Sequence, residues 1–199
     1  MKLRLSIFQV ALLVLCSGRG LAAGKTAESP PPIQERVYMT AEQALAETFP
    51  KGVRHEPEIK VVTAEIRERL EKKLGRPVPD STVTVQKVLD DSGHLLGYGV
   101  VSDEIGKYHP ITFLVGATPE LKVERVSILV YRESHGADVR RTRFLNQYRG
   151  KSPESPIRSN QDIVNISGAT LSVQAMNYGV RKVLGLLAEL YPAEVKTRP

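Results

Sequence analysis

The sequence has only one cysteine, Cys16, and it lies in an N-terminal segment with the features of an export signal. Lys2 and Arg4 give a positive start, residues 7–15 form a short apolar run, and residues 20–23 offer small side chains for cleavage. A chain cleaved there has no disulfide, no thiolate metal ligand, no iron–sulfur cluster and no Cys-x-x-Cys-His haem site. Any redox chemistry then needs an organic cofactor or a cysteine-free metal site.

Several other site signatures are missing as well. The four histidines show no His-x-x-x-His spacing, and the sequence has neither a Gly-x-Ser-x-Gly elbow nor a P-loop. The formal net charge of +6 falls to +3 without residues 1–23, because that segment carries three basic residues and no acid. So weak a charge gives no reason to expect a nucleic-acid partner.

Two other interpretations of the N-terminal segment stay open. Residues 7–15 are too short for a membrane span but could form a buried helix. Cys16 could instead carry a lipid, although Leu15 stands where a lipid-attachment site wants a small residue. We expect an exported protein, periplasmic or otherwise outside the cytoplasm, with membrane association left open.

The rest of the chain divides by composition and hydrophobic period. Three consecutive prolines mark a polar linker, and two helix candidates follow, with Thr40 and Thr63 as N-caps. We expect a signal peptide at 1–23, a linker at 24–37, an N-terminal helical extension at 38–78 and one main domain at 79–192.

Between residues 82 and 131 the hydrophobic period becomes two, which predicts strands. Asp90-Asp-Ser-Gly93 is a hairpin turn, and the other connections are also short. Short connections favour an antiparallel meander over parallel units. The predicted strands cover residues 82–89, 95–102, 111–116 and 123–131, and helices are expected at 137–149 and 171–191.

The run Ser167-Gly168-Ala169-Thr170 leads directly into the last predicted helix. A helix N-terminus offers free backbone N–H groups and the positive end of the helix dipole, and both favour a phosphate. Gly168 and Ala169 let a phosphate approach the backbone closely. The alternative is that Thr170 or Ser167 is an ordinary helix N-cap.

This run resembles the flavin-attachment motif of the FMN-binding domain family, in which the threonine carries FMN through a phosphoester bond. Residues 106–113, 131–136 and 143–150 resemble that family in order and spacing. Relatives include flavin-bearing subunits of the sodium-pumping NADH:quinone reductase and of the related ferredoxin-oxidising complex. The resemblance implies FMN as the cofactor and an α+β fold with a curved antiparallel sheet (meander) flanked by helices. Val164 stands where many members carry an acid, and the nearest acid is Asp162.

The resemblance also implies that the segment after the last strand lines the flavin. His135 or Arg132 would supply positive charge near the reduced ring, and Lys107 would neutralise a phosphate; alternatively, these side chains are merely solvated. Three further arginines at 140, 141 and 143 either face solvent or dock an acidic electron partner. The expected cofactor-binding residues are Thr170, Ser167, Gly168, Ala169, Glu133, Ser134, His135, Gly136 and Lys107, with no metal ligand and no catalytic residue.

Three functions are consistent with the sequence. The first is an exported electron carrier with FMN on Thr170, modified by a flavin transferase and exchanging electrons with membrane or periplasmic proteins; it is not a stand-alone enzyme. The second is a module that binds FMN or another phosphate ligand without a covalent bond. The third is a hydrolase using Ser134 and His135, which is weak because neighbouring strand residues point apart.

Overall fold

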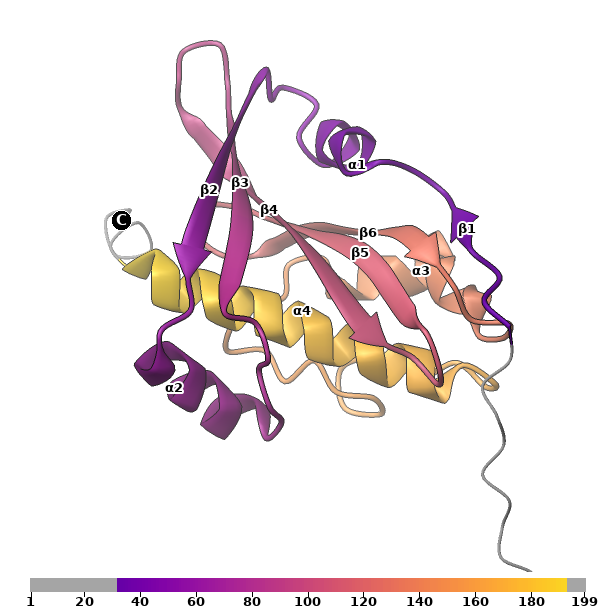
Figure 1. Ribbon diagram of the computed structural model, residues 1–199. Coiled ribbons are helices and arrows are strands. Elements are labelled where there is room, and N and C mark those ends of the chain that lie inside the picture. Colours follow the sequence, from indigo (N-terminus) through magenta and orange to yellow (C-terminus); the bar gives the residue numbers. More distant parts are fainter. Residues whose placement is uncertain (1–31, 193–199) are drawn as a thin grey trace, which may run out of the picture. The chain divides into compact units, whose positions relative to one another are not determined.

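Six antiparallel strands form the centre of the fold (Figure 1). The computed structural model describes residues 32–192, which all fall within a single compact unit. The expected signal segment and most of the expected linker lie outside these residues. The sheet order is β1-β6-β5-β4-β3-β2, so β2 to β6 follow one another as a meander, as predicted. The strands are β1 (Arg36–Val37), β2 (Arg54–Val61), β3 (Thr82–Leu89), β4 (Leu95–Ile105), β5 (Pro110–Ala117) and β6 (Val123–Tyr131).

The four predicted strands are confirmed as β3 to β6, but the sequence did not indicate β1 and β2. β2 lies inside the segment expected to be a helical extension. It alternates charged residues with others and contains Pro57, a pattern that does not suggest a strand. Charges and proline are tolerated there because β2 is an edge strand with one unpaired side.

The helix α4 (Thr170–Leu190) covers one face of the sheet, confirming the last predicted helix almost to the residue. Successive strands present Val85, Val100, Val115 and Val126 in register, and all four side chains are buried. They pack with the apolar face of α4 to form the main core. Burial of this continuous apolar layer is the principal stabilising contribution to the fold.

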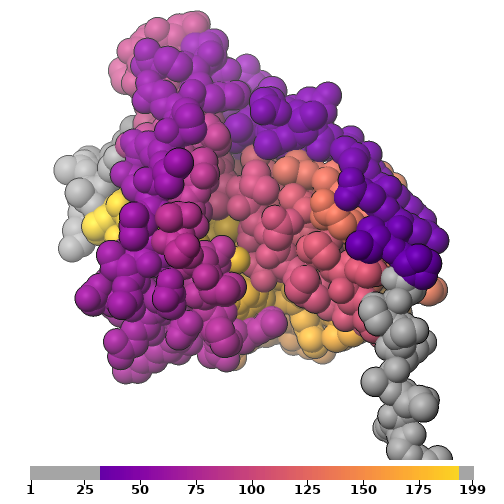
Figure 2. All heavy atoms as spheres, viewed as in Figure 1, coloured from indigo at the N-terminus to yellow at the C-terminus, as the bar shows by residue number. Residues whose placement is uncertain are grey.

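Two shorter helices complete the layers. α1 (Ala41–Thr48) packs Leu45 against the opposite face of the sheet, and α2 (Ala64–Leu74) packs Leu70 beside α4. Thr40 and Thr63 are their N-caps, as predicted. In Figure 2 the strands around residues 100–115 stay visible between α1 and β2–β3, so α1 covers only part of its face. No helix within residues 32–192 is long and apolar enough to cross a membrane.

The segment predicted as one helix at 137–149 is instead three short pieces. These are the 3₁₀ turn η1 (Ala137–Arg140), α3 (Thr142–Leu145) and the 3₁₀ turn η2 (Asn146–Tyr148). The backbone at Arg141 is extended, with φ −59° and ψ 130°, and separates the first two pieces. None of the pieces has a side-chain cap, and burial of Phe144 and Tyr148 holds them on the sheet.

Candidate functional site

Thr170 is the first residue of α4, and its side chain is exposed. The N-cap is Ala169, which has no side-chain cap hydrogen bond, so the interpretation of Thr170 or Ser167 as an N-cap is wrong. The first bond within the helix runs from the N–H of Val173 to the carbonyl oxygen of Ala169, at 2.9 Å. The N–H groups of residues 170–172 therefore have no partner inside the helix and point toward its open end.

A cavity of about 280 Å³ lies against this end of α4. Tyr108, Leu171 and Ser172 contribute to its lining together with expected residues from three separate segments. Ser167 and Gly136 do not line it. The expected residues that do are Lys107, Glu133, Ser134, His135, Gly168, Ala169 and Thr170.

The hydroxyl of Thr170 has one hydrogen-bond partner in the described part of the chain. Asn165 Nδ2 donates to Thr170 Oγ1 over 3.2 Å. Because the oxygen accepts that bond, its own proton is directed elsewhere. Gly168, with φ +79°, has no atom within 4 Å of the position where a Cβ would stand. The backbone before Thr170 is thus open to a ligand.

Glu133 is buried, with 3% of its surface exposed, and its carboxylate accepts hydrogen bonds from the backbone. Its Oε1 accepts the N–H of Tyr108 at 2.6 Å and that of His109 at 3.0 Å. These bonds hold the turn between β4 and β5, which carries Lys107 to the cavity. Glu133 therefore positions a cationic residue of the site.

Ser134 and His135 meet, contrary to the expectation that they point apart. Ser134 Oγ lies 2.9 Å from His135 Nδ1. The alternation of strand side chains does not apply, because β6 ends at Tyr131 and both residues lie in the following loop. Within residues 32–192, no carboxylate pairs with His135, so the third member of a hydrolytic triad is missing.

The sequence did not indicate a buried contact that fixes this loop. Tyr131 Oη donates to the carbonyl oxygen of His135 at 2.5 Å and lies 3.0 Å from Ser172 Oγ. Burial raises the pKa of Tyr131, so the phenol stays protonated and keeps donating. The loop is thereby tied to the first turn of α4.

Only some of the basic side chains named from the sequence line this cavity. Arg132 does not line the cavity, because its guanidinium binds Glu35 and Thr112, each at 2.8 Å. Arg141 pairs with Asp138 at 2.8 Å. Arg143 lines a neighbouring cavity of about 430 Å³, to which Asn165 also contributes. Of the basic side chains named from the sequence, Lys107 and His135 line the cavity beside Thr170.

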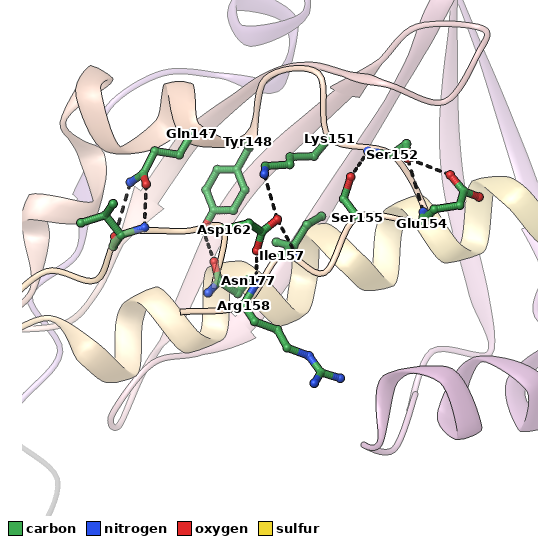
Figure 3. Close-up of polar contacts among 11 residues, drawn as sticks. Gln147, Tyr148, Lys151, Ser152, Glu154, Ser155, Ile157, Arg158, Asp162 and Asn177 are labelled. Carbon is green, nitrogen blue, oxygen red and sulfur yellow. Dashed lines mark hydrogen bonds and ion pairs between the residues drawn. The ribbon is translucent and has the colours of Figure 1, made fainter. Parts of the chain in front are cut away.

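Asp162 does not take the place of the acid that Val164 replaces. Its carboxylate binds Lys151 Nζ at 2.8 Å and the N–H groups of Arg158 at 2.8 Å and Ile157 at 3.1 Å (Figure 3). Burial opposes ionisation, but these bonds outweigh it and lower the pKa of Asp162. The carboxylate thus stabilises the loop in which it lies.

The fold and the cavity together define an α+β domain that presents an uncapped helix start to a ligand. Residues 106–185 match the family described as FMN-binding domain, and this part of the chain belongs to that family. Its cofactor is FMN, and the protein is a flavoprotein. No group of three or more His, Cys, Asp or Glu residues within residues 32–192 is placed to hold a metal ion.

The fold itself has a known counterpart. The crystal structure of Shewanella oneidensis NqrC is similar, with a TM-score of 0.52 and 16% sequence identity. The similarity covers 76% of this chain and 88% of that chain. None of the curated proteins matches this chain in sequence.

Proposed function

We propose that this protein is an exported electron carrier in which FMN is esterified to Thr170. The observation that carries the proposal is the position of Thr170: its hydroxyl is exposed, stands at an uncapped helix start and borders a cavity. Thr170 does not cap the helix, so a capping role does not account for this residue.

The residues at the site suit the phosphate end of FMN. The free N–H groups of residues 170–172 and the helix dipole favour a phosphate, and Lys107 adds positive charge. Asn165 orients the hydroxyl, and Gly168 leaves room beside it. The cavity of about 280 Å³ is slightly smaller than the range of about 300–1,000 Å³ usual for ligand pockets, so it suits the phosphate and its neighbourhood better than a whole flavin.

Attachment requires an activated flavin donor and a flavin transferase as modifying enzyme. Thr170 Oγ forms a bond to the flavin's phosphorus, the hydroxyl proton passes to a base, and the donor's other phosphate leaves with the bonding electron pair. Once bound, the flavin supplies one- or two-electron transfer, while the protein holds it and excludes side reactions.

Export and the redox partners belong to the same proposal. Residues 1–23 have the composition of a signal peptide, and residues 24–37 that of a linker. The partners we propose are membrane or periplasmic electron-transfer proteins. The division into a 38–78 extension and a 79–192 FMN-binding domain is also part of the proposal; β2, from the extension, lies in the same sheet as that domain.

The test is co-expression with a flavin transferase, followed by intact mass measurement under denaturing conditions. We expect an added FMN mass in the wild type and in Ser167→Ala, which removes a nearby exposed hydroxyl, and none in Thr170→Ala. Unmodified wild-type protein that binds FMN reversibly would support the second candidate, a non-covalent module. Modification that persists in Thr170→Ala would contradict the assignment of the residue.

The electron-transfer role needs a separate measurement. Flavinylated protein is reduced with dithionite, and its reoxidation by ferricyanide is followed by stopped flow. We expect complete and rapid reoxidation, since the cavity is open to solvent. A reduced flavin that ferricyanide cannot reach would contradict a carrier role.

A further inference from the structure

We propose that a second cavity, of about 390 Å³, is a binding site for a small phosphate-bearing molecule. It lies between the end of α2, the loop at residues 157–160 and the middle of α4. It shares no lining residue with the cavity beside Thr170. The site is therefore separate from the one assigned to FMN.

Three arginines converge on this cavity: Arg76, Arg158 and Arg181. No carboxylate is among the lining residues in the described chain. Arg181 Nε is buried and has no hydrogen-bond partner within residues 32–192. Burial lowers the pKa of Arg181, and repulsion from Arg158 and Arg76 lowers it further. A bound oxyanion would offset this repulsion between the guanidinium groups.

The donors are held in place by neighbouring contacts. The guanidinium of Arg76 lies over the ring of Tyr178 at 4.4 Å, and Tyr178 Oη donates to the carbonyl oxygen of Pro77 at 2.6 Å. Both contacts restrict the rotamers of Arg76 and reduce the entropy that a ligand must overcome.

Ser159 adds a neutral donor. Asn177 Oδ1 accepts a hydrogen bond from Tyr148 Oη at 2.7 Å, which fixes the orientation of the amide. Asn177 Nδ2 then donates to Ser159 Oγ at 3.2 Å. Because the serine oxygen accepts that bond, its proton remains available to a ligand in the cavity.

The contacts that hold the loop carrying Arg158 do not neutralise the charge of the Arg158 guanidinium. Asp162 binds the backbone N–H of Arg158 and the ammonium of Lys151, and Figure 3 shows the Arg158 guanidinium pointing away from that carboxylate. Ile157 and Asn160 in this loop have φ of +46° and +62°, which is uncommon for residues other than glycine. Such strain persists only where surrounding contacts impose it.

A phosphate monoester or a diphosphate is the ligand class that fits best. Arginine forks match phosphate oxygens in pairs, and three guanidiniums suit a ligand with at least two negative charges. The volume also leaves space for part of the molecule that carries the phosphate.

The probe is pyrophosphate, compared with chloride at equal ionic strength, and the readout is the Tm of the full chain. We expect pyrophosphate well above its Kd to raise the Tm by about 5 °C or more. The rise should vanish in Arg158→Gln/Arg181→Gln. It should persist in Arg54→Gln, which removes one positive charge from β2 as Arg158→Gln alone does from the cavity, and in Thr170→Ala, which removes the proposed FMN anchor.

Arg158→Gln alone serves if the double variant folds poorly, because Arg158 is exposed. A wild-type Tm that responds equally to pyrophosphate and chloride would overturn the proposal. So would a rise of equal size in the arginine variants. Loss of the effect only in Thr170→Ala would assign the anion to the other cavity and also count against this site.

Sedimentation with phosphatidylcholine vesicles, with and without phosphatidic acid, distinguishes the source of the phosphate. Co-sedimentation that needs both phosphatidic acid and the arginines assigns the site to a lipid headgroup. Protein that stays in the supernatant while responding to pyrophosphate assigns it to a soluble phosphate compound.

Discussion

At the residue scale, Gly136 is confined by its neighbours. Its φ is +84°, and a Cβ there would stand 2.7 Å from Ser172 Oγ and 2.8 Å from Tyr131 Oη. From the sequence, this glycine was expected to be a cofactor-binding residue. The structure gives it a different reason, which the sequence could not reveal because both neighbours come from other elements.

Gly136→Ala should therefore destabilise the protein by about 2–4 kcal/mol, from backbone strain and overlap together. The free energy of unfolding in urea measures it. Gly150→Ala is the matched control, because Gly150 has φ +76° but nothing within 4 Å of its would-be Cβ. That change should cost only about 1–2 kcal/mol. Equal costs for the two variants would contradict the packing role of Gly136.

Glu133 gives a second test at this scale. Glu133→Ala leaves the N–H groups of Tyr108 and His109 without their acceptor and should cost about 2 kcal/mol or more. Amide hydrogen exchange at both residues should accelerate as the turn loosens. Glu133→Gln keeps an acceptor oxygen and should retain most of the protection. If exchange in the alanine variant stayed slow, Glu133 would not be positioning the Lys107 turn.

At the scale of elements, predictability followed the strength of the hydrophobic period. α4 was found because Val173, Met176, Val180 and Val183 recur at helical spacing and are all buried. The segment at 137–149 has only a few apolar positions and no caps, so its predicted single helix was wrong. β2 was missed because an edge strand needs no continuous apolar face.

Edge strand β2 is tied to the end of α4 through Glu58. Its carboxylate binds Lys60 at 2.8 Å, Tyr191 at 2.8 Å and Lys87 at 3.2 Å. Hydrogen bonds from Lys60 and then Tyr191 lower the pKa of Glu58 from 4.5 to about 2. The native state thus favours the ionised form more strongly than the unfolded chain does.

The stabilisation from Glu58 is therefore complete above about pH 5 and is lost as the pH falls toward 2. Glu58→Gln should cost about 1 kcal/mol at pH 7, a modest value because the side chain is 32% exposed. The difference from wild type should shrink between pH 5 and pH 2 in urea denaturation. A difference that stays constant over that range would show that Glu58 acts by packing and not by charge.

At the scale of the whole molecule, the two proposed anion sites differ in how far the sequence alone predicts them. Seven of the nine residues expected from the sequence line the cavity beside Thr170, and three of them, residues 168–170, are contiguous in the sequence; their binding of a cofactor stays a prediction. The arginine cavity takes Arg76, Arg158 and Arg181 from three distant segments. Only the packing of α2 and the 157–160 loop on α4 brings them together.

The central claim is that one hydroxyl, that of Thr170, carries FMN. Tandem mass spectrometry of peptides from the flavinylated wild-type protein tests it most directly, since Ser167, Thr170 and Ser172 fall close together in sequence. Fragment ions should place the FMN mass on Thr170 alone, because Ser172 is buried and Ser167 lies outside the cavity. FMN on either serine, or no FMN on any peptide after denaturation, would contradict the account.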